Sequence, residues 1–170
     1  MKKKLLTTAI FALAISLFAL PAFGQGDFSD PNAEYTFTIP SDSWKMTVKP
    51  SRISPNVEYV YRFRNEGHLE VRKTSVDSGT TFDEIIREEE QKLQFKPGYV
   101  AGRDESFKGA MEGRVFNYEF VRSGRNMSGR FYFLKADPTT VYILRFTGER
   151  DSLRTLRNET DLIARTFKLK

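Results

Sequence analysis

The chain of 170 residues contains no cysteine and one histidine, His68. Without cysteine, disulfides, thiol nucleophiles and a lipid-modified cysteine are all excluded. With one histidine, the chain lacks the ligands of a histidine-rich zinc site. His68 follows Gly67 in a segment with turn composition, so we interpret it as a solvated turn residue rather than as a general base or a metal ligand.

Catalytic and phosphate-binding motifs are also missing. The sequence has no G-x-S-x-G motif, and its 11 glycines do not gather into a phosphate-binding loop. The densest carboxylates are Glu88, Glu89 and Glu90, and successive helical residues point in different directions. We therefore expect this run to be a solvated face rather than a Ca²⁺ site, and we predict no catalytic, metal or cofactor-binding residue.

One enzymatic alternative stays open. A secreted hydrolase could use carboxylates and tyrosines, for instance Glu119 or Asp104 beside Tyr118 or Tyr132, if a concave pocket shifted their pKa values. The first interpretation, a non-enzymatic binding or assembly protein, needs no such pocket. The enzymatic hypothesis therefore requires a pocket that holds a carboxylate beside a tyrosine, and the binding hypothesis does not.

The N-terminus has the pattern of a secretory signal peptide. Lys2, Lys3 and Lys4 precede an apolar stretch that ends before Pro21, and Ala22-Phe23-Gly24 provides small residues for cleavage. An uncleaved anchor would need about 20 apolar residues, and this stretch is shorter. We predict a signal peptide over residues 1–24, a short leader over 25–33 and a single domain over 34–170. The protein would then be periplasmic or extracellular, without a membrane span after cleavage, and would not meet nucleic acid.

Charge is unevenly distributed along the chain. The chain has 27 Lys+Arg against 22 Asp+Glu; the predicted signal peptide holds three of the lysines, which leaves 24 against 22. Residues 25–112 carry 12 basic and 16 acidic side chains, whereas residues 113–170 carry 12 and 6. Because arginine suits carboxylates and phosphates, we expect an acidic envelope protein or another anionic surface as partner, unless these are ordinary solvated positions. The candidate contact residues are Arg150, Arg154, Arg157, Arg165 and Lys168.

Hydrophobic periodicity predicts the elements of one antiparallel sheet. Period-2 alternation indicates strands near residues 35–39, 44–48, 57–64, 69–76, 99–107, 114–122, 129–135 and 140–147. The runs RFYFL and VYILRF are apolar on both faces, which is typical of central strands covered on both sides. The fold class is therefore α+β, with helices on an antiparallel sheet in a three-layer α/β/α sandwich of one domain, and a monomer is expected.

Two helices are expected to cover that sheet. Thr81 and Glu84 form a capping-box pattern at the start of a helix over 82–95, whose inner stripe includes Glu89. A second amphipathic helix carries Leu153, Leu156 and Ile163. After it, Phe167 and Leu169 alternate with lysines, which predicts a short closing strand and a buried Phe167.

The C-terminal half resembles a known family. The runs GRVFNYEF, GRFYFLKA and VYILRFTGE, a last helix ending IARTFKL, and the opening YTFTIPSDSW together resemble the PsbP-like sandwich shared with Mog and DcrB-like domains. The resemblance spans residues 34–170 and implies the fold and a binding or assembly role. A photosystem extrinsic protein is an alternative that it also implies. The plant-type pattern, however, has a longer N-terminal arm and a histidine in one of its strands. The corresponding strand here, residues 129–135, contains no histidine, which disfavours the photosystem alternative.

Overall fold

The computed structural model describes residues 26–170; the predicted signal peptide lies outside the described residues. Most of the described chain is strand, and its helices are short. The strands are β1 (Gly26–Ser29), β2 (Tyr35–Ile39), β3 (Trp44–Val48), β4 (Val57–Tyr61), β5 (Gly67–Ser75), β6 (Val100–Lys108), β7 (Glu112–Arg122), β8 (Arg125–Asp137), β9 (Thr140–Glu149) and β10 (Lys168–Leu169). The helices are α1 (Phe82–Gln91), α2 (Arg150–Thr155) and α3 (Arg157–Thr166).

Two antiparallel sheets organise the domain. The larger sheet has the order β3-β4-β5-β9-β8-β7-β6, and the smaller has the order β1-β2-β10. All eight predicted strands are present, and the α+β prediction is confirmed. The predicted end of β4 at residue 64 is wrong, however: the strand ends at Tyr61, and Phe63 is 67% exposed.

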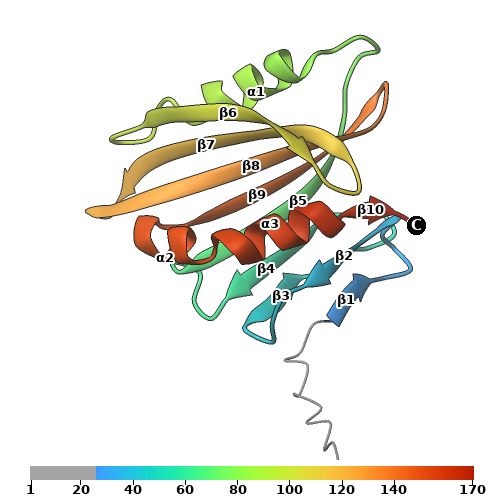
Figure 1. Cartoon of the computed structure of the whole chain (residues 1–170), viewed down its shortest axis with the longest axis horizontal. Coiled ribbons are helices and arrows are strands. Elements are labelled where there is room, and N and C mark those ends of the chain that lie inside the picture. Colours follow the sequence, from blue (N-terminus) through green and yellow to red (C-terminus); the bar gives the residue numbers. More distant parts are fainter. Residues whose placement is uncertain (1–25) are drawn as a thin grey trace, which may run out of the picture.

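The layers follow from the two-faced apolar strands β8 and β9. Phe131, Tyr132, Phe133 and Leu134 are all fully buried, and their alternating side chains enter two different cores. Helix α1 covers one face of the large sheet, whereas α2, α3 and the small sheet cover the other (Figure 1). This is the three-layer arrangement that burial on both faces requires.

The helix α1 begins as the sequence predicts. Thr81 and Glu84 form the complete capping box, which satisfies backbone donors that the first turn leaves unpaired. The second predicted helix is instead two helices, α2 and α3, which meet at Leu156. Leu156 is 4% exposed, so the break lies over the core and redirects α3 across the sheet.

Both ends of the described chain belong to the fold. Within the segment expected to be a leader, Phe28 is 4% exposed and stacks on Phe37 at 4.8 Å between ring centroids. At the other end, Phe167 is fully buried against Tyr35, and β10 pairs with β2. The closing segment therefore packs as predicted, and the folded part extends to Gly26, further than the expected boundary.

Residues 26–170 include two hydrophobic cores and all the strands that the structure describes. Within that range, none of the helices has the length and apolar character needed to cross a bilayer. The same residues hold no cluster of three or more potential metal-binding side chains.

Candidate functional site: an arginine groove and a charged ladder

Two adjoining cavities lie between α2–α3 and the strands β6, β7 and β8. Their volumes are about 680 and 380 Å³, and Asn117, Arg130 and Arg157 line both. We call the combined surface the arginine groove, because six arginines line it: Arg103, Arg130, Arg150, Arg154, Arg157 and Arg165.

The groove exists because the helices do not cover the whole sheet. Helices α2 and α3 lie over β8, β9 and β2, whereas β6 is an edge strand with an almost entirely exposed surface. The β6–β7 turn closes one end of the groove, because the backbone N–H of Ala110 donates to the carbonyl of Arg165 at 2.8 Å. A Cβ at Gly109 would lie 2.7 Å from Cα of Arg165, so this close approach requires glycine.

A polar cluster fixes the floor of the groove. The Arg130 guanidinium donates through Nε to Asn117 Oδ1 at 2.8 Å and through Nη1 to Asp161 Oδ1 at 3.3 Å. The Tyr132 hydroxyl also donates to Asp161. Burial raises the pKa of Tyr132, so its hydroxyl stays protonated and keeps this role at neutral pH. The cluster joins α3 to β8.

The walls carry more positive than negative charge. Three carboxylates face the six arginines: Glu119 pairs with Arg150 at 3.5 Å, Asp161 pairs with Arg130, and Glu105 completes the set. Among residues 26–170, Arg103 and Arg165 form no ion pair with a carboxylate. The groove therefore keeps an excess of guanidinium groups, which favours an anionic occupant.

Of the five predicted contact residues, four line the groove. Arg150, Arg154, Arg157 and Arg165 gather there, whereas Lys168 lies on β10 and pairs with Thr36 of the small sheet. Sequence reasoning missed Arg103 and Arg130, which come from strands. Their approach to α3 depends on strand register, and no local pattern in the chain specifies it.

The structure does not bring together the residues of the enzymatic alternative. Tyr118 and Glu119 are successive residues of β7, so their side chains point to opposite faces, and Tyr118 is 1% exposed. Asp104 pairs with Arg114. Tyr132 contacts Asp161, a carboxylate that the sequence analysis had not paired with it.

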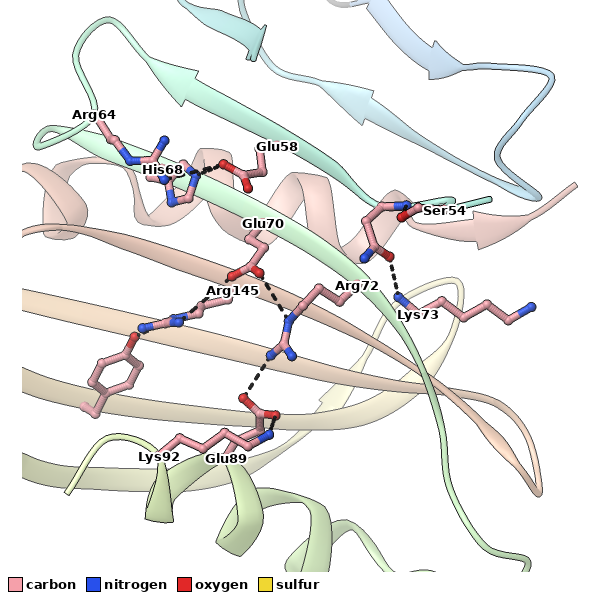
Figure 2. Close-up of polar contacts among 12 residues, drawn as sticks. Ser54, Glu58, Arg64, His68, Glu70, Arg72, Lys73, Glu89, Lys92 and Arg145 are labelled. Carbon is pink, nitrogen blue, oxygen red and sulfur yellow. Dashed lines mark hydrogen bonds and ion pairs between the residues drawn. The ribbon is translucent and has the colours of Figure 1, made fainter. Parts of the chain in front are cut away.

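The opposite face of the sheet carries a second group of charges. Figure 2 shows a row of alternating signs, the charged ladder, made of Lys92, Glu89, Arg72, Glu70 and Arg145. The contacts are 2.7 Å for Lys92–Glu89, 2.9 Å for Glu89–Arg72, 3.4 Å for Arg72–Glu70 and 3.9 Å for Glu70–Arg145. Each interior charge has an opposite charge on both sides.

Glu89 lies on the inner stripe of α1, as the helical periodicity predicts, so the expectation that the whole run Glu88 to Glu90 is solvated is wrong. Glu89 is 6% exposed and faces Arg72 of β5. Burial by itself would raise the pKa of Glu89, but the hydrogen bonds and charges of Lys92 and Arg72 outweigh it and hold that pKa below its usual value. Glu89 is therefore an ionised link between helix and sheet.

His68 also differs from its predicted environment. It lies within β5, its side chain is 14% exposed, and its Nε2 is 2.8 Å from Glu58 Oε2 (Figure 2). Burial lowers the pKa of His68 and outweighs the effect of the contact with Glu58, which raises it. The imidazole is thus a neutral, partly buried strand residue, not a solvated turn residue.

Solved structures show the same fold. The Ran-binding protein Mog1p of Saccharomyces cerevisiae has a TM-score of 0.62 at 9% identity, covering 86% of this chain and 96% of Mog1p. The cyanobacterial PsbP protein CyanoP of Synechocystis has a TM-score of 0.59 at 12% identity, covering 90% and 96%. LpqN of Mycobacterium tuberculosis, described as involved in cell envelope biogenesis, has a TM-score of 0.54 at 14% identity, covering 86% and 91%.

No protein-family model and no curated protein matches the sequence. The likeness to these structures therefore rests on the fold, at identities well below those that carry function. The chain has the PsbP/Mog-like α+β fold, and the predicted resemblance is confirmed at that level.

Proposed function

We propose that this protein is an exported, non-enzymatic binding module that holds an acidic segment of a partner protein in the arginine groove. The observation that carries the proposal is the convergence of six arginines on adjoining cavities that contain three carboxylates. Arginine forms bidentate, charge-assisted hydrogen bonds with carboxylates, so several glutamates or aspartates of one segment could each find a partner there.

The fold neighbours support a binding role. Mog1p is a Ran-binding protein, and LpqN is involved in cell envelope biogenesis. The predicted signal peptide supports an envelope location for this chain, which agrees with the role of LpqN. The polar floor around Arg130 gives the groove a fixed shape, which lowers the entropic cost of holding a partner.

A fluorescently labelled glutamate-rich peptide tests the proposal directly. The domain should bind it with an affinity that falls as salt rises, because exposed charge pairs are screened. Arg150/Arg154/Arg157→Glu should weaken binding by about a hundredfold, since several charge-assisted hydrogen bonds become repulsive. The matched control is Lys45/Lys49/Arg87→Glu, an equal charge change at exposed positions outside the groove.

The native partner is then sought by cross-linking in envelope extract. Photo-cross-linkers placed at Arg154 and Lys45 should give different products, with an acidic protein captured only from Arg154. Equal loss of peptide binding in the two triple variants would show that net charge, and not the groove, determines the interaction.

A further inference from the structure

A second cationic pocket lies on the α1 side of the sheet, next to the end of the charged ladder. Its volume is about 250 Å³, and four basic side chains from four segments line it: Arg64, Lys96, Arg122 and Arg145. Strand alternation places Phe120, Arg122 and Arg145 on the face of the sheet opposite the arginine groove. The pocket is therefore a separate feature from the site of the proposed function.

The carboxylates near this pocket already have partners. Glu58 contacts His68 at 2.8 Å and Arg64 at 3.5 Å, and Glu70 lies between Arg72 and Arg145 in the ladder. These two are the only acidic side chains among the residues that line the pocket. Nearby, Glu149 accepts from Asn65 and pairs with Arg125.

Two of the cations have no such partner. In residues 26–170, neither Lys96 nor Arg122 forms an ion pair. Lys96 is half-buried, with its Nζ 5.0 Å from the centroid of the Phe120 ring. Partial burial, followed by the charges of Arg145 and Arg122, lowers the pKa of Lys96, so these cations act on one another in the pocket.

Arg145 is held in a fixed orientation toward this pocket. Its Nε donates to the Tyr118 hydroxyl at 3.0 Å, and its guanidinium lies 5.4 Å from the centroid of the Phe131 ring. A guanidinium fixed by hydrogen bonding and stacking loses little entropy when an anion binds. The pocket thus combines one preoriented cation with two that form no ion pair within residues 26–170.

We propose that this pocket binds a phosphate group through Lys96, Arg122 and Arg145. A single anionic group fits the site better than a whole metabolite does, because small-molecule sites usually occupy about 300–1,000 Å³. Phosphate offers several acceptor oxygens for the two guanidinium forks and the ammonium group. Its charge compensates the cations that otherwise repel one another.

The surroundings of the pocket indicate how the source of the phosphate can be identified. Phe63 and Phe95 directly precede the pocket residues Arg64 and Lys96, and they are 67% and 93% exposed. Exposed aromatic side chains beside basic residues favour the interface of an anionic membrane. A lipid headgroup would use both features, whereas a soluble phosphate would use the pocket alone.

Calorimetric titration of the domain of residues 26–170 with sodium phosphate, at constant ionic strength, tests the pocket. We expect saturable binding that Lys96→Gln/Arg122→Gln weakens by about tenfold or more. The control Lys49→Gln/Arg87→Gln removes the same charge from exposed sites and should bind as the parent does. Circular dichroism of each variant establishes that the fold is kept.

Vesicle flotation distinguishes the two sources. The probes are phosphatidylcholine vesicles with and without phosphatidylglycerol. Binding that needs phosphatidylglycerol and is lost in both Lys96→Gln/Arg122→Gln and Phe63→Ser/Phe95→Ser assigns the phosphate to a lipid headgroup. Phosphate binding without vesicle binding assigns it to a soluble ligand. Absence of binding to both probes, or binding that Lys96→Gln/Arg122→Gln leaves intact, overturns the proposal.

Discussion

The charged ladder and the arginine groove use the same residue type in opposite ways. In the ladder, Arg72 is 26% exposed in its side chain and lies between Glu70 and the almost buried Glu89. In the groove, Arg154 is 78% exposed, and its one pair is with Asp151, a neighbour on its own helix that is equally exposed. The ladder compensates its own charges, and the groove does not.

This difference separates a structural role from a binding role. Removing one partner of a desolvated ion pair leaves a charge without compensation, whereas exposed pairs contribute little to stability. We therefore expect the ladder charges to affect unfolding and the groove charges to affect association.

The largest effect should come from the core between the small sheet and the large sheet. Phe167 is fully buried and lies 4.9 Å from Tyr35 and 5.1 Å from Tyr142, measured between ring centroids. Phe167→Ala should lower the free energy of unfolding by about 3–5 kcal/mol, because it removes buried aromatic surface and leaves a cavity. Urea denaturation measures the change, and an unaltered midpoint would refute the packing role of this residue.

The ladder should show the next largest effect. Glu89→Gln keeps the size of the side chain but removes the charge that faces Arg72 and Lys92. We expect a loss of about 2 kcal/mol, the scale of a hydrogen bond to a charged group in a partly desolvated site. The exposed neighbour Glu88→Gln is the matched control, and similar losses in both variants would contradict the account of the ladder.

Acid should weaken the fold in two steps. The folded pKa of His68 is below its unfolded value of about 6.5, so the unfolded chain binds more protons and stability falls as the pH drops below that value. The folded pKa of Glu89 is also lowered, so its contribution is present above about 4.3 and is lost as the pH falls further. Thermal melts across pH should show a shallower first step in His68→Gln and a shallower second step in Glu89→Gln. If the melting temperature of His68→Gln changes with pH in the same way as that of the parent, His68 does not cause the first step.

The smallest effect on stability should come from the groove. Arg154→Gln/Arg157→Gln changes two side chains that are 78% and 65% exposed. Their ion pairs are solvated, so the free energy of unfolding should change by less than about 0.5 kcal/mol. A drop as large as that of Glu89→Gln, measured in the same urea titration, would mean that the groove arginines hold the fold together.

The sequence predicts the strands and the core well because these depend on local patterns. The double-faced apolar run from Phe131 to Leu134 requires a central strand with cover on both sides, and the Thr81–Glu84 pair marks the start of α1. The break at Leu156 was not foreseen, because Leu153, Leu156 and Ile163 suit one continuous amphipathic helix equally well. In the structure, Leu156 is buried at the point where α2 ends and α3 begins, so this periodicity does not ensure a single helix.

The sites were only partly predictable because they depend on long-range register. The arginines of α2 and α3 could be grouped along one helical region, but Arg130 and Arg103 join them only through the pairing of β6, β7 and β8. His68 was misplaced for a related reason: the β4–β5 turn ends two residues earlier than expected, and the His68 side chain then faces Glu58 across the strands.

The most direct test measures peptide affinity and unfolding free energy together in Arg150/Arg154/Arg157→Gln and in Glu89→Gln. We expect the groove variant to lose affinity for the glutamate-rich peptide and keep its stability, and the ladder variant to lose stability and keep its affinity. A groove variant that binds the peptide as tightly as the parent would show that the arginine groove does not hold an acidic segment.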